Sequence, residues 1–246
     1  ALCTKMKLST LSSKMSLLSI NSNAKTSKSS ELFPDTLTAI LYLSPHKLAG
    51  HGNVCAHATD GCMQTCLYTA GRGKFSTVQQ ARIKKTKLFF EDNDSFKLNL
   101  FGDISMFYNY CKEHNLKGYV RLNGTSDINW QIVKISGKTF FEHFPLLSFY
   151  DYTKDIKRKP LFKNYHITFS YNEKVTVEEV SEKLKDNINV AVVFDNVPST
   201  WKGFEVVDGD LSDLRPKDKV NVVVGLKAKG LARTIKTDFV IKTVNI

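Results

Sequence analysis

The sequence contains no long hydrophobic run, since no stretch approaches the roughly 20 consecutive apolar residues that a membrane-spanning helix requires. Its first 30 residues carry five lysines and no acidic residue. Their apolar side chains are scattered and do not form the continuous core of a secretory signal. These absences argue against a membrane partner and against secretion, so we expect a protein of the cytoplasm.

Two motifs of nucleotide and ester chemistry are also missing. No segment matches G-x-x-x-x-G-K-[ST], the loop that cradles nucleotide phosphates, and the short "GRGK" at 71–74 does not replace it. No serine stands in the strand-turn-helix context of a nucleophile elbow. We therefore expect neither a nucleotide-driven motor nor a hydrolase of the serine-triad type.

The chain does have an excess of positive charge. Its 246 residues include 35 Lys and Arg against 24 Asp and Glu, a net charge of +11. Such a balance favours an anionic partner, such as nucleic acid or a phosphorylated ligand, although a lysine-rich solvated surface produces the same excess. We predict a basic, serine-rich arm over residues 1–30, with little ordered packing in residues 1–16, and a single domain over residues 31–246.

Short apolar runs rich in strand formers alternate with segments of helical spacing. The predicted strands are 37–44, 118–127, 146–154, 165–172, 189–196, 203–210 and 219–230, and the predicted helices are 76–92, 96–115, 130–144 and 176–187. This alternation predicts right-handed βαβ units and a mostly parallel sheet. The expected fold class is α/β, with a TIM-barrel-like arrangement that is complete or has fewer than eight strands.

Three cysteines lie in the long segment that follows the first predicted strand. Cys55, Cys62 and Cys66 are separated by six and three residues, a spacing of neither a common zinc finger nor a thioredoxin pair. Three thiolates suit an iron–sulfur cluster with one iron left open. Zinc is the competing occupant, with His51 or His57 as a fourth ligand, and three thiols packed beneath the loop are the simplest alternative. Cys3 and Cys111 stand apart from this group.

Polar residues gather where the predicted strands end, the place at which α/β folds locate their chemistry. Arg121, Asn123, Ser126 and Asp127 combine a guanidinium, an amide, a hydroxyl and a carboxylate, which together suit an anionic ligand that also carries a hydroxyl group. The same residues are also typical of a turn and a helix cap. We include all four in a predicted ligand pocket.

Later strands add further candidates for this pocket. Tyr150, Tyr152 and Lys154 share one strand face that suits stacking against a base, although tyrosines there also occur as ordinary packing. The remaining candidates are Arg72 after the cysteines, His166 and Ser170 on another strand, and Lys227 and Lys229 as an anion cradle. The acidic residues of 208–215 are interpreted as turn and cap formers.

Several blocks together resemble a known family. They include "NAKTSKS" (23–29), "GCMQTCLYTAGRG" (61–73), "VRLNGTSDI" (120–128), "FYDYTK" (149–154), "DGDLSDLR" (208–215) and "VGLKAKGLAR" (224–233). In this order they resemble an uncharacterised bacteriophage family known as gene product eighty-eight, from about residue 17 to the carboxyl end. The resemblance implies a phage-encoded protein of the host cytoplasm.

A more distant similarity is to the radical S-adenosylmethionine (SAM) superfamily, whose barrel also carries its cysteines in the first loop. It implies a 4Fe-4S cluster on Cys55, Cys62 and Cys66, SAM as cofactor and an enzyme with an unknown substrate. The superfamily spaces its cysteines by three and two residues with an aromatic before the last, whereas Thr65 precedes Cys66 here. "RLNGTSD" also stands where that superfamily has a Gly-Gly-Glu stretch. The alternative is a non-enzymatic nucleic-acid-binding protein of phage replication, with a structural zinc or cluster site.

Overall fold

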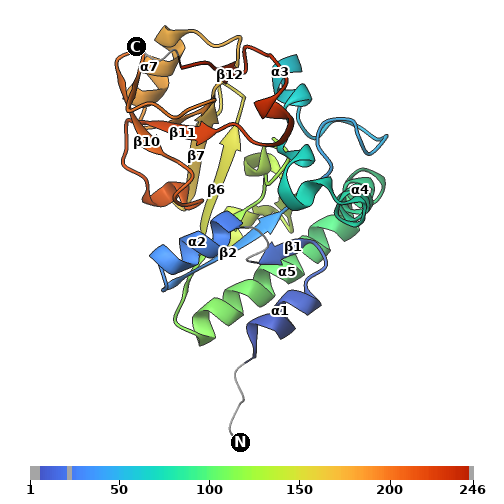
Figure 1. Ribbon diagram of the computed structural model, residues 1–246. Helices are drawn as coiled ribbons and strands as arrows, with labels where there is room; N and C mark the ends of the chain where they lie inside the picture. The colour runs from blue at the N-terminus through green and yellow to red at the C-terminus, as the bar shows by residue number, and fades with distance from the viewer. Residues whose placement is uncertain (1–5, 21–23, 244–246) are drawn as a thin grey trace, which may run out of the picture.

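A large mixed sheet forms the centre of the fold (Figure 1). The structure is a computed structural model that describes residues 6–20 and 24–243. Within them nine strands follow the order β1-β2-β3-β6-β7-β8-β11-β10-β9, and a tenth, β12, pairs with β8. Their bounds are β1 Leu18–Ile20, β2 Thr36–Leu41, β3 Lys117–Arg121, β6 Ser148–Thr153, β7 Tyr165–Ser170, β8 Val190–Phe194, β9 Thr200–Trp201, β10 Phe204–Asp208, β11 Val223–Lys227 and β12 Val240–Ile241.

The sheet is largely parallel, which confirms the α/β class. Only β1 against β2 and β9 against β10 pair in the antiparallel sense among the strands of this sheet. The sheet is not closed into a barrel, so the prediction of a closed TIM-like arrangement is wrong. Closure would need the free edge of β2, and β1 occupies that edge by pairing Leu18 with Leu41 and Ile20 with Ala39.

Helices cover one face of the sheet. α4 (Ser76–Glu91) and α5 (Asn93–Glu113) confirm two predicted helices, and α7 (Val177–Lys185) confirms a third. α5 buries Phe96, Leu100, Ile104 and Phe107 in the same cluster as residues of β2, β3 and β6. α7 starts with a capping box between Thr176 and Glu179 and packs over the other half of the sheet.

The amino-terminal segment is part of the packed structure. α1 (Leu8–Lys14) buries Leu11 completely, and the Asp103 carboxylate of α5 accepts the backbone N–H groups of Leu17 and Leu18 at 2.7 and 2.9 Å. The prediction of little ordered packing in residues 1–16 is therefore wrong for residues 8–14. A helix of seven residues with one buried leucine is too short to show a 3.6-residue period.

The opposite face of the sheet is polar. Strand register places Tyr150 beside His166 and Tyr152 beside Thr168, and the guanidinium of Arg121 lies over the ring of Tyr152, so these side chains project from the same side. We call this side of β3, β6 and β7 the polar face. It is covered by α2 (Ala24–Leu32) and by residues 209–218 between β10 and β11, because Ser29 accepts the N–H of Asp213 at 2.8 Å and Leu214 packs against Tyr119 and Tyr150.

The sheet forks at β8. Its first half pairs with β7 through Val190 and Ala191, and its second half pairs with β12 through Val193 and Phe194. β12 thus fills the space that opens as β7 and β8 diverge toward their carboxyl ends. The fork brings residues near the end of the chain to the edge of the sheet that carries the cysteines.

The segment 130–144 was predicted as one helix, and that prediction is wrong. It contains a 3-10 turn (η3, Trp130–Ile132), a hairpin of β4 (Lys134–Ile135) and β5 (Lys138–Thr139), and the short α6 (Phe140–His143). Gly137 at φ +80° makes the hairpin turn that interrupts the helical pattern. Among the helices of the described residues, none has the length and apolarity needed to cross a membrane.

Candidate functional site

The three cysteines lie on the loop that leaves the carboxyl end of β2. We call residues 42–75 the thiol loop; it contains α3 (Asp60–Gln64) and the 3-10 turns η1 (Leu67–Thr69) and η2 (Gly71–Lys74). Glu173, which follows β7, accepts the N–H of Gly61 at 3.0 Å and the hydroxyl of Thr59 at 2.9 Å. A Cβ at Gly61 would lie 2.8 Å from the Cβ of Phe239, next to β12. The thiol loop is therefore fixed at the carboxyl edge, as predicted for functional loops of this fold class.

The three thiols lie close enough to affect one another electrostatically. Burial, with smaller contributions from the charges of Cys66 and Cys62, raises the pKa of the Cys55 thiol to about 12. Burial raises the pKa of Cys66 too, with Cys62 again contributing. The backbone N–H of His46 points at the sulfur of Cys55 at 3.3 Å, and a backbone hydrogen bond from Tyr68 acts on Cys66. Hydrogen bonds of this kind to sulfur are typical of the surroundings of metal-bound thiolates.

The donor set was compared with the two metal groups that the sequence suggested. In residues 6–20 and 24–243, no three His, Cys, Asp or Glu side chains converge as they would around a single ion. His57 and His51, the candidate fourth ligands of zinc, lie instead 3.7 Å from Asp155 and 3.2 Å from Glu91. Tetrahedral zinc requires thiolates only about 3.8 Å apart, whereas a four-iron cluster holds them on separate irons. In the described residues the three thiols therefore form no site for a single metal ion.

Two cations lie next to the thiols. The charges of Lys154 and Arg82 both act on Cys66. Lys154 donates to Ser170 at 2.6 Å and lies 5.1 Å from the ring centroid of Phe239. Arg82, on α4, lies over the ring of Tyr42 at 4.7 Å, and its buried Nε and Nη1 atoms have no hydrogen-bond partner. Sequence analysis missed Arg82, because one arginine in a helix of lysines carries no distinguishing signal.

Arg121 is held inside the fold by Asp213. Nη1 of Arg121 lies 3.2 Å from Oδ2 of Asp213, and the guanidinium lies 4.7 Å from the ring centroid of Tyr152. Tyr150 donates to the same carboxylate at 3.3 Å. Burial lowers the pKa of Arg121, but Asp213 and the tyrosines raise it by more, so the guanidinium stays charged. Asp127, which we placed with Arg121 in one predicted pocket, is bound instead by Arg158.

Four buried polar atoms near Arg121 have no partner in the described structure. They are Nε of Arg121, Nε2 of His166, Oγ1 of Thr168 and Nε of Arg215. Arg121, His166 and Thr168 belong to the polar face, and the charge of Arg215 acts on His166. Burial and Arg215 lower the pKa of His166 to about 4, so its ring is neutral near pH 7. Unsatisfied polar groups gathered in one place indicate a region suited to a polar ligand or to bound water.

Asn123, Ser126 and Asp127 have structural contacts. Oδ1 of Asn123 accepts from the Ser126 hydroxyl at 2.8 Å, the N–H of Ile128 at 2.9 Å and the ring N–H of Trp130 at 3.2 Å. Asn123 thus organises the turn after β3, and its side-chain oxygen is not available to a ligand. These contacts agree with the alternative interpretation of the sequence, in which Asn123 and its neighbours form a turn.

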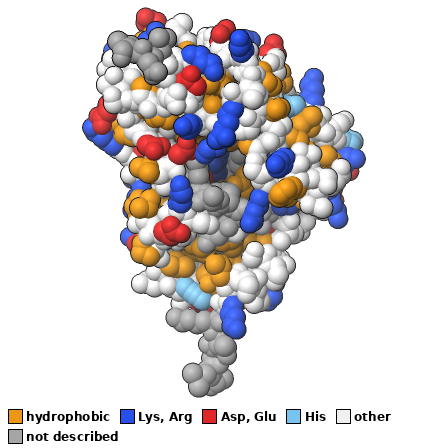
Figure 2. All heavy atoms as spheres, in the orientation of Figure 1, with side chains coloured by type: hydrophobic (Ala, Val, Ile, Leu, Met, Phe, Trp, Pro, Cys, Tyr) orange, Lys and Arg blue, Asp and Glu red, His pale blue; other side chains and the backbone are white. Residues whose placement is uncertain are grey.

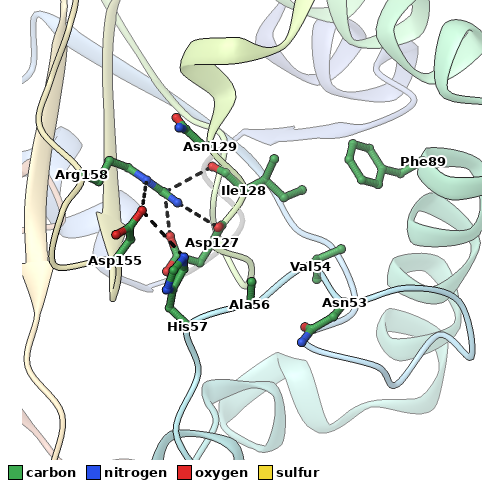
Figure 3. Close-up of a pocket in the computed structure, with 10 residues that line it drawn as sticks. All are labelled: Asn53, Val54, Ala56, His57, Phe89, Asp127, Ile128, Asn129, Asp155 and Arg158. Atoms are coloured by element: carbon green, nitrogen blue, oxygen red, sulfur yellow. Dashed lines mark hydrogen bonds and ion pairs between the residues drawn. The ribbon is translucent and has the colours of Figure 1, made fainter. Parts of the chain in front are cut away.

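Asp127 lines a separate, shallow cavity of about 320 Å³, one wall of which is formed by the thiol loop (Figure 3). Nη1 of Arg158 donates to Oδ1 of Asp127 at 2.7 Å, and the N–H of Lys154 donates to Oδ2 at 2.8 Å. Figure 3 shows His57, Asp155 and Arg158 pointing toward Asp127, with Phe89 on the opposite wall. The N–H of Asp127 donates to the carbonyl of Val54 at 2.7 Å, which ties this cavity to the residue before Cys55. Arg158 is a further residue that sequence analysis missed.

The remaining candidates are Lys227, which ends β11, Lys229, which follows it, and Arg72 on the thiol loop. Lys229 forms an ion pair with Asp210 at 2.7 Å, and the N–H of Lys227 donates to the same carboxylate at 2.9 Å. The predicted cradle is therefore partly neutralised by Asp210. Arg72 lies in η2, exposed on the thiol loop.

Comparison with known proteins identifies one family. A family model described as gene product 88 matches residues 12–243, nearly the whole chain. The chain belongs to the gene product 88 family. The gene product 88 match includes the thiol loop, the polar face and β12, so the features described above all lie within the family segment. No curated protein and no solved structure matches the chain. The family resemblance is confirmed, whereas the likeness to radical SAM barrels finds no support in these comparisons.

Proposed function

We propose that this protein binds an iron–sulfur cluster through Cys55, Cys62 and Cys66 and uses it in radical-SAM-like chemistry. The observation that carries the proposal is the proximity of the three cysteines on the thiol loop, at the carboxyl edge of a parallel sheet, where the charges of Cys66 and Cys62 act on Cys55 and that of Cys62 acts on Cys66. Soft thiolate ligands favour iron–sulfur clusters over hard-ion sites. The N–H group of His46, directed at the sulfur of Cys55, supports a bound thiolate there.

The surroundings supply counter-charge for such a site. A cluster with three thiolate ligands is an anionic group, and Lys154 and Arg82 are the cations whose charges act on Cys66. Arg82 matters most, because its buried Nε and Nη1 atoms have no partner within the fold. A guanidinium in that state costs folding free energy unless a bound anion compensates it.

When bound, a cluster with one open iron would supply the electron that cleaves the sulfonium of SAM, which is the chemistry of a SAM-dependent radical enzyme. The role of the chain is to bind and orient the ligand and to exclude water. Arg82 suits the ligand carboxylate, since a guanidinium binds carboxylates through two hydrogen bonds. His166, neutral near pH 7, suits a hydroxyl group or a ring nitrogen, because its unpartnered Nε2 can donate or accept.

SAM binding under anaerobic conditions tests this function. Protein reconstituted with iron and sulfide should bind SAM in a calorimeter, and with dithionite it should release 5′-deoxyadenosine. The Cys62→Ser variant, reconstituted in parallel, should do neither, while Cys111→Ser should behave as the parent does. SAM binding of equal strength to metal-free protein, or no binding to cluster-loaded protein, would contradict the proposal.

A further inference from the structure

A second pocket lies at the carboxyl ends of β8, β11 and β12. Its volume is about 210 Å³, and it is lined by Asp195, Lys227, Ala228, Ala232, Arg233 and Lys242. Three separate segments supply its cations, because Lys227 ends β11, Arg233 lies in the 3-10 turn η5 (Gly230–Arg233) and Lys242 follows β12. We call this the basic pocket. It is distinct from the polar face and from the cavity around Asp127.

The positive charge of the basic pocket is not neutralised by ion pairs. None of Lys227, Arg233 and Lys242 forms an ion pair with a carboxylate in the described part of the chain, and all three are exposed. Asp195 is the one acidic lining residue, and its Oδ1 accepts from the N–H and hydroxyl of Thr243 at 2.9 and 2.7 Å. Nε of Arg233 donates to the carbonyl of Ala228 at 3.2 Å, which fixes the base of that guanidinium. Such a pocket favours a multiply charged anion.

The floor of the basic pocket adjoins the thiol loop. Ala228 and Ala232 line the pocket and also belong to the apolar cluster against which Cys62 packs. Gly230 comes so close to the loop that a Cβ there would lie 3.0 Å from the Cβ of Ala70. The basic pocket and Cys62 therefore contact the same apolar cluster.

We propose that the basic pocket binds the phosphate backbone of a polynucleotide, with its three cations contacting successive phosphates, and so presents that polynucleotide to the thiol site. The pocket is open and its cations are exposed at its rim, which suits a chain that passes across the surface more than a small ion enclosed on all sides. The net charge of +11 favours the same partner. Figure 2 shows Lys and Arg side chains, with Asp and Glu among them, over the upper part of the molecule, the part that contains β11 and β12 in Figure 1. In naming the substrate class of the thiol site, this inference rests on the proposed function.

Fluorescence anisotropy with short labelled single-stranded RNA and DNA tests the pocket. The probe variant is the triple change Lys227→Gln, Arg233→Gln and Lys242→Gln. Removal of three phosphate contacts should lower the affinity roughly 100-fold near 0.1 M salt and reduce the slope of log affinity against log salt by about 2. The iron content of the variant should equal that of the parent, because none of the three residues is a proposed ligand.

A matched variant controls for net charge. Lys112, Lys163 and Lys185 are exposed and lie in the last turn of α5, just before β7 and at the end of α7, at the amino edge of the sheet. The triple change of these lysines to Gln removes the same charge and should leave most of the affinity and the salt slope in place. Equal losses in the two variants would overturn the proposal, since binding would then depend on total charge alone.

Other anions distinguish the source of the phosphate. Inorganic phosphate and pyrophosphate should compete weakly, and vesicles that contain anionic lipid should not bind the protein more tightly than neutral vesicles. Oligonucleotide binding that is absent in the parent, or vesicle binding that the probe variant abolishes, would contradict the inference. A parent protein that holds no cluster but still binds the oligonucleotides would instead contradict only the proposed function.

Discussion

Nη1 of Arg121 lies 3.2 Å from Oδ2 of Asp213, and the two side chains are only 13% and 6% exposed. Arg121 ends β3 and Asp213 belongs to the segment between β10 and β11, so the pair joins the two halves of the sheet. The contact of Arg121 with the ring of Tyr152 completes the arrangement. The pair fixes residues 209–218 over the polar face.

The Asp213→Asn variant should be strongly destabilised. It leaves the Arg121 guanidinium buried without its counter-charge, and breaking a buried pair in this way costs about 3 to 5 kcal/mol of unfolding free energy. Urea unfolding followed by tryptophan fluorescence measures the change. The control is Lys219→Gln, which removes an exposed pair with Glu205 and should cost under about 1 kcal/mol. Similar losses in the two variants would show that the Arg121 pair is not a structural clamp.

Asp151 should make the fold more stable in mild acid than at neutral pH. Burial raises the pKa of its carboxyl to about 7, against an ordinary value near 4 in the unfolded chain. The folded state therefore holds a proton that the unfolded state loses, and this contribution to stability disappears as pH rises from about 4 to about 7.

The Asp151→Asn variant tests this pH dependence, because an amide carries no charge at any of these values. Relative to the variant, the parent should lose on the order of 3 kcal/mol of unfolding free energy between pH 4 and pH 7. Parallel pH profiles for the parent and the variant would contradict the raised pKa.

Leu11 should be essential for the amino-terminal packing. Its side chain is fully buried, so Leu11→Ala should cost about 2 to 5 kcal/mol through lost burial and the cavity left behind. Ser12→Ala, at an exposed neighbouring position of α1, should change stability by less than about 0.5 kcal/mol. Thermal unfolding compares the two. An unchanged melting temperature for Leu11→Ala would show that α1 does not complete the core.

The long periodic elements could be predicted from the sequence. α4, α5, α7 and the buried strands β2, β3, β6, β7 and β8 lie where apolar periodicity placed them. Short elements could not, because β1, β12 and α1 each contain too few residues to show a period. Sheet closure also depends on which strand pairs with the edge of β2, a long-range choice that no local pattern records.

The candidate site, like the fold, could be predicted only in part. The position of the thiol loop after the first parallel strand followed from topology alone. The partner of Arg121 on the polar face did not, because Asp213 lies 92 residues from Arg121 and was interpreted as a turn former. Arg82 and Arg158 were missed for the same reason, since what sets them apart is burial and tertiary contact, not local sequence.

The stability of an Arg82 variant tests whether this residue serves the fold or a bound anion. Replacement by Met removes a buried guanidinium that no carboxylate compensates, so metal-free Arg82→Met should be as stable as the parent or about 1 to 3 kcal/mol more stable. The Arg158→Met variant should lose stability instead, since it abandons the buried carboxylate of Asp127. Chemical unfolding of the metal-free proteins measures both. A destabilised Arg82→Met would indicate that Arg82 serves the fold and not a bound anion.

The central claim is that Cys55, Cys62 and Cys66 together hold an iron–sulfur cluster. The most direct measurement is the visible spectrum and the iron and acid-labile sulfide content of protein purified without oxygen, for the parent and for the three single Cys→Ser variants. The account predicts a brown parent protein with iron and sulfide in equal amounts, and the loss of both in each variant, because removal of one ligand opens the cluster to solvent. A colourless parent protein, or full iron content in any one of the three variants, would contradict it.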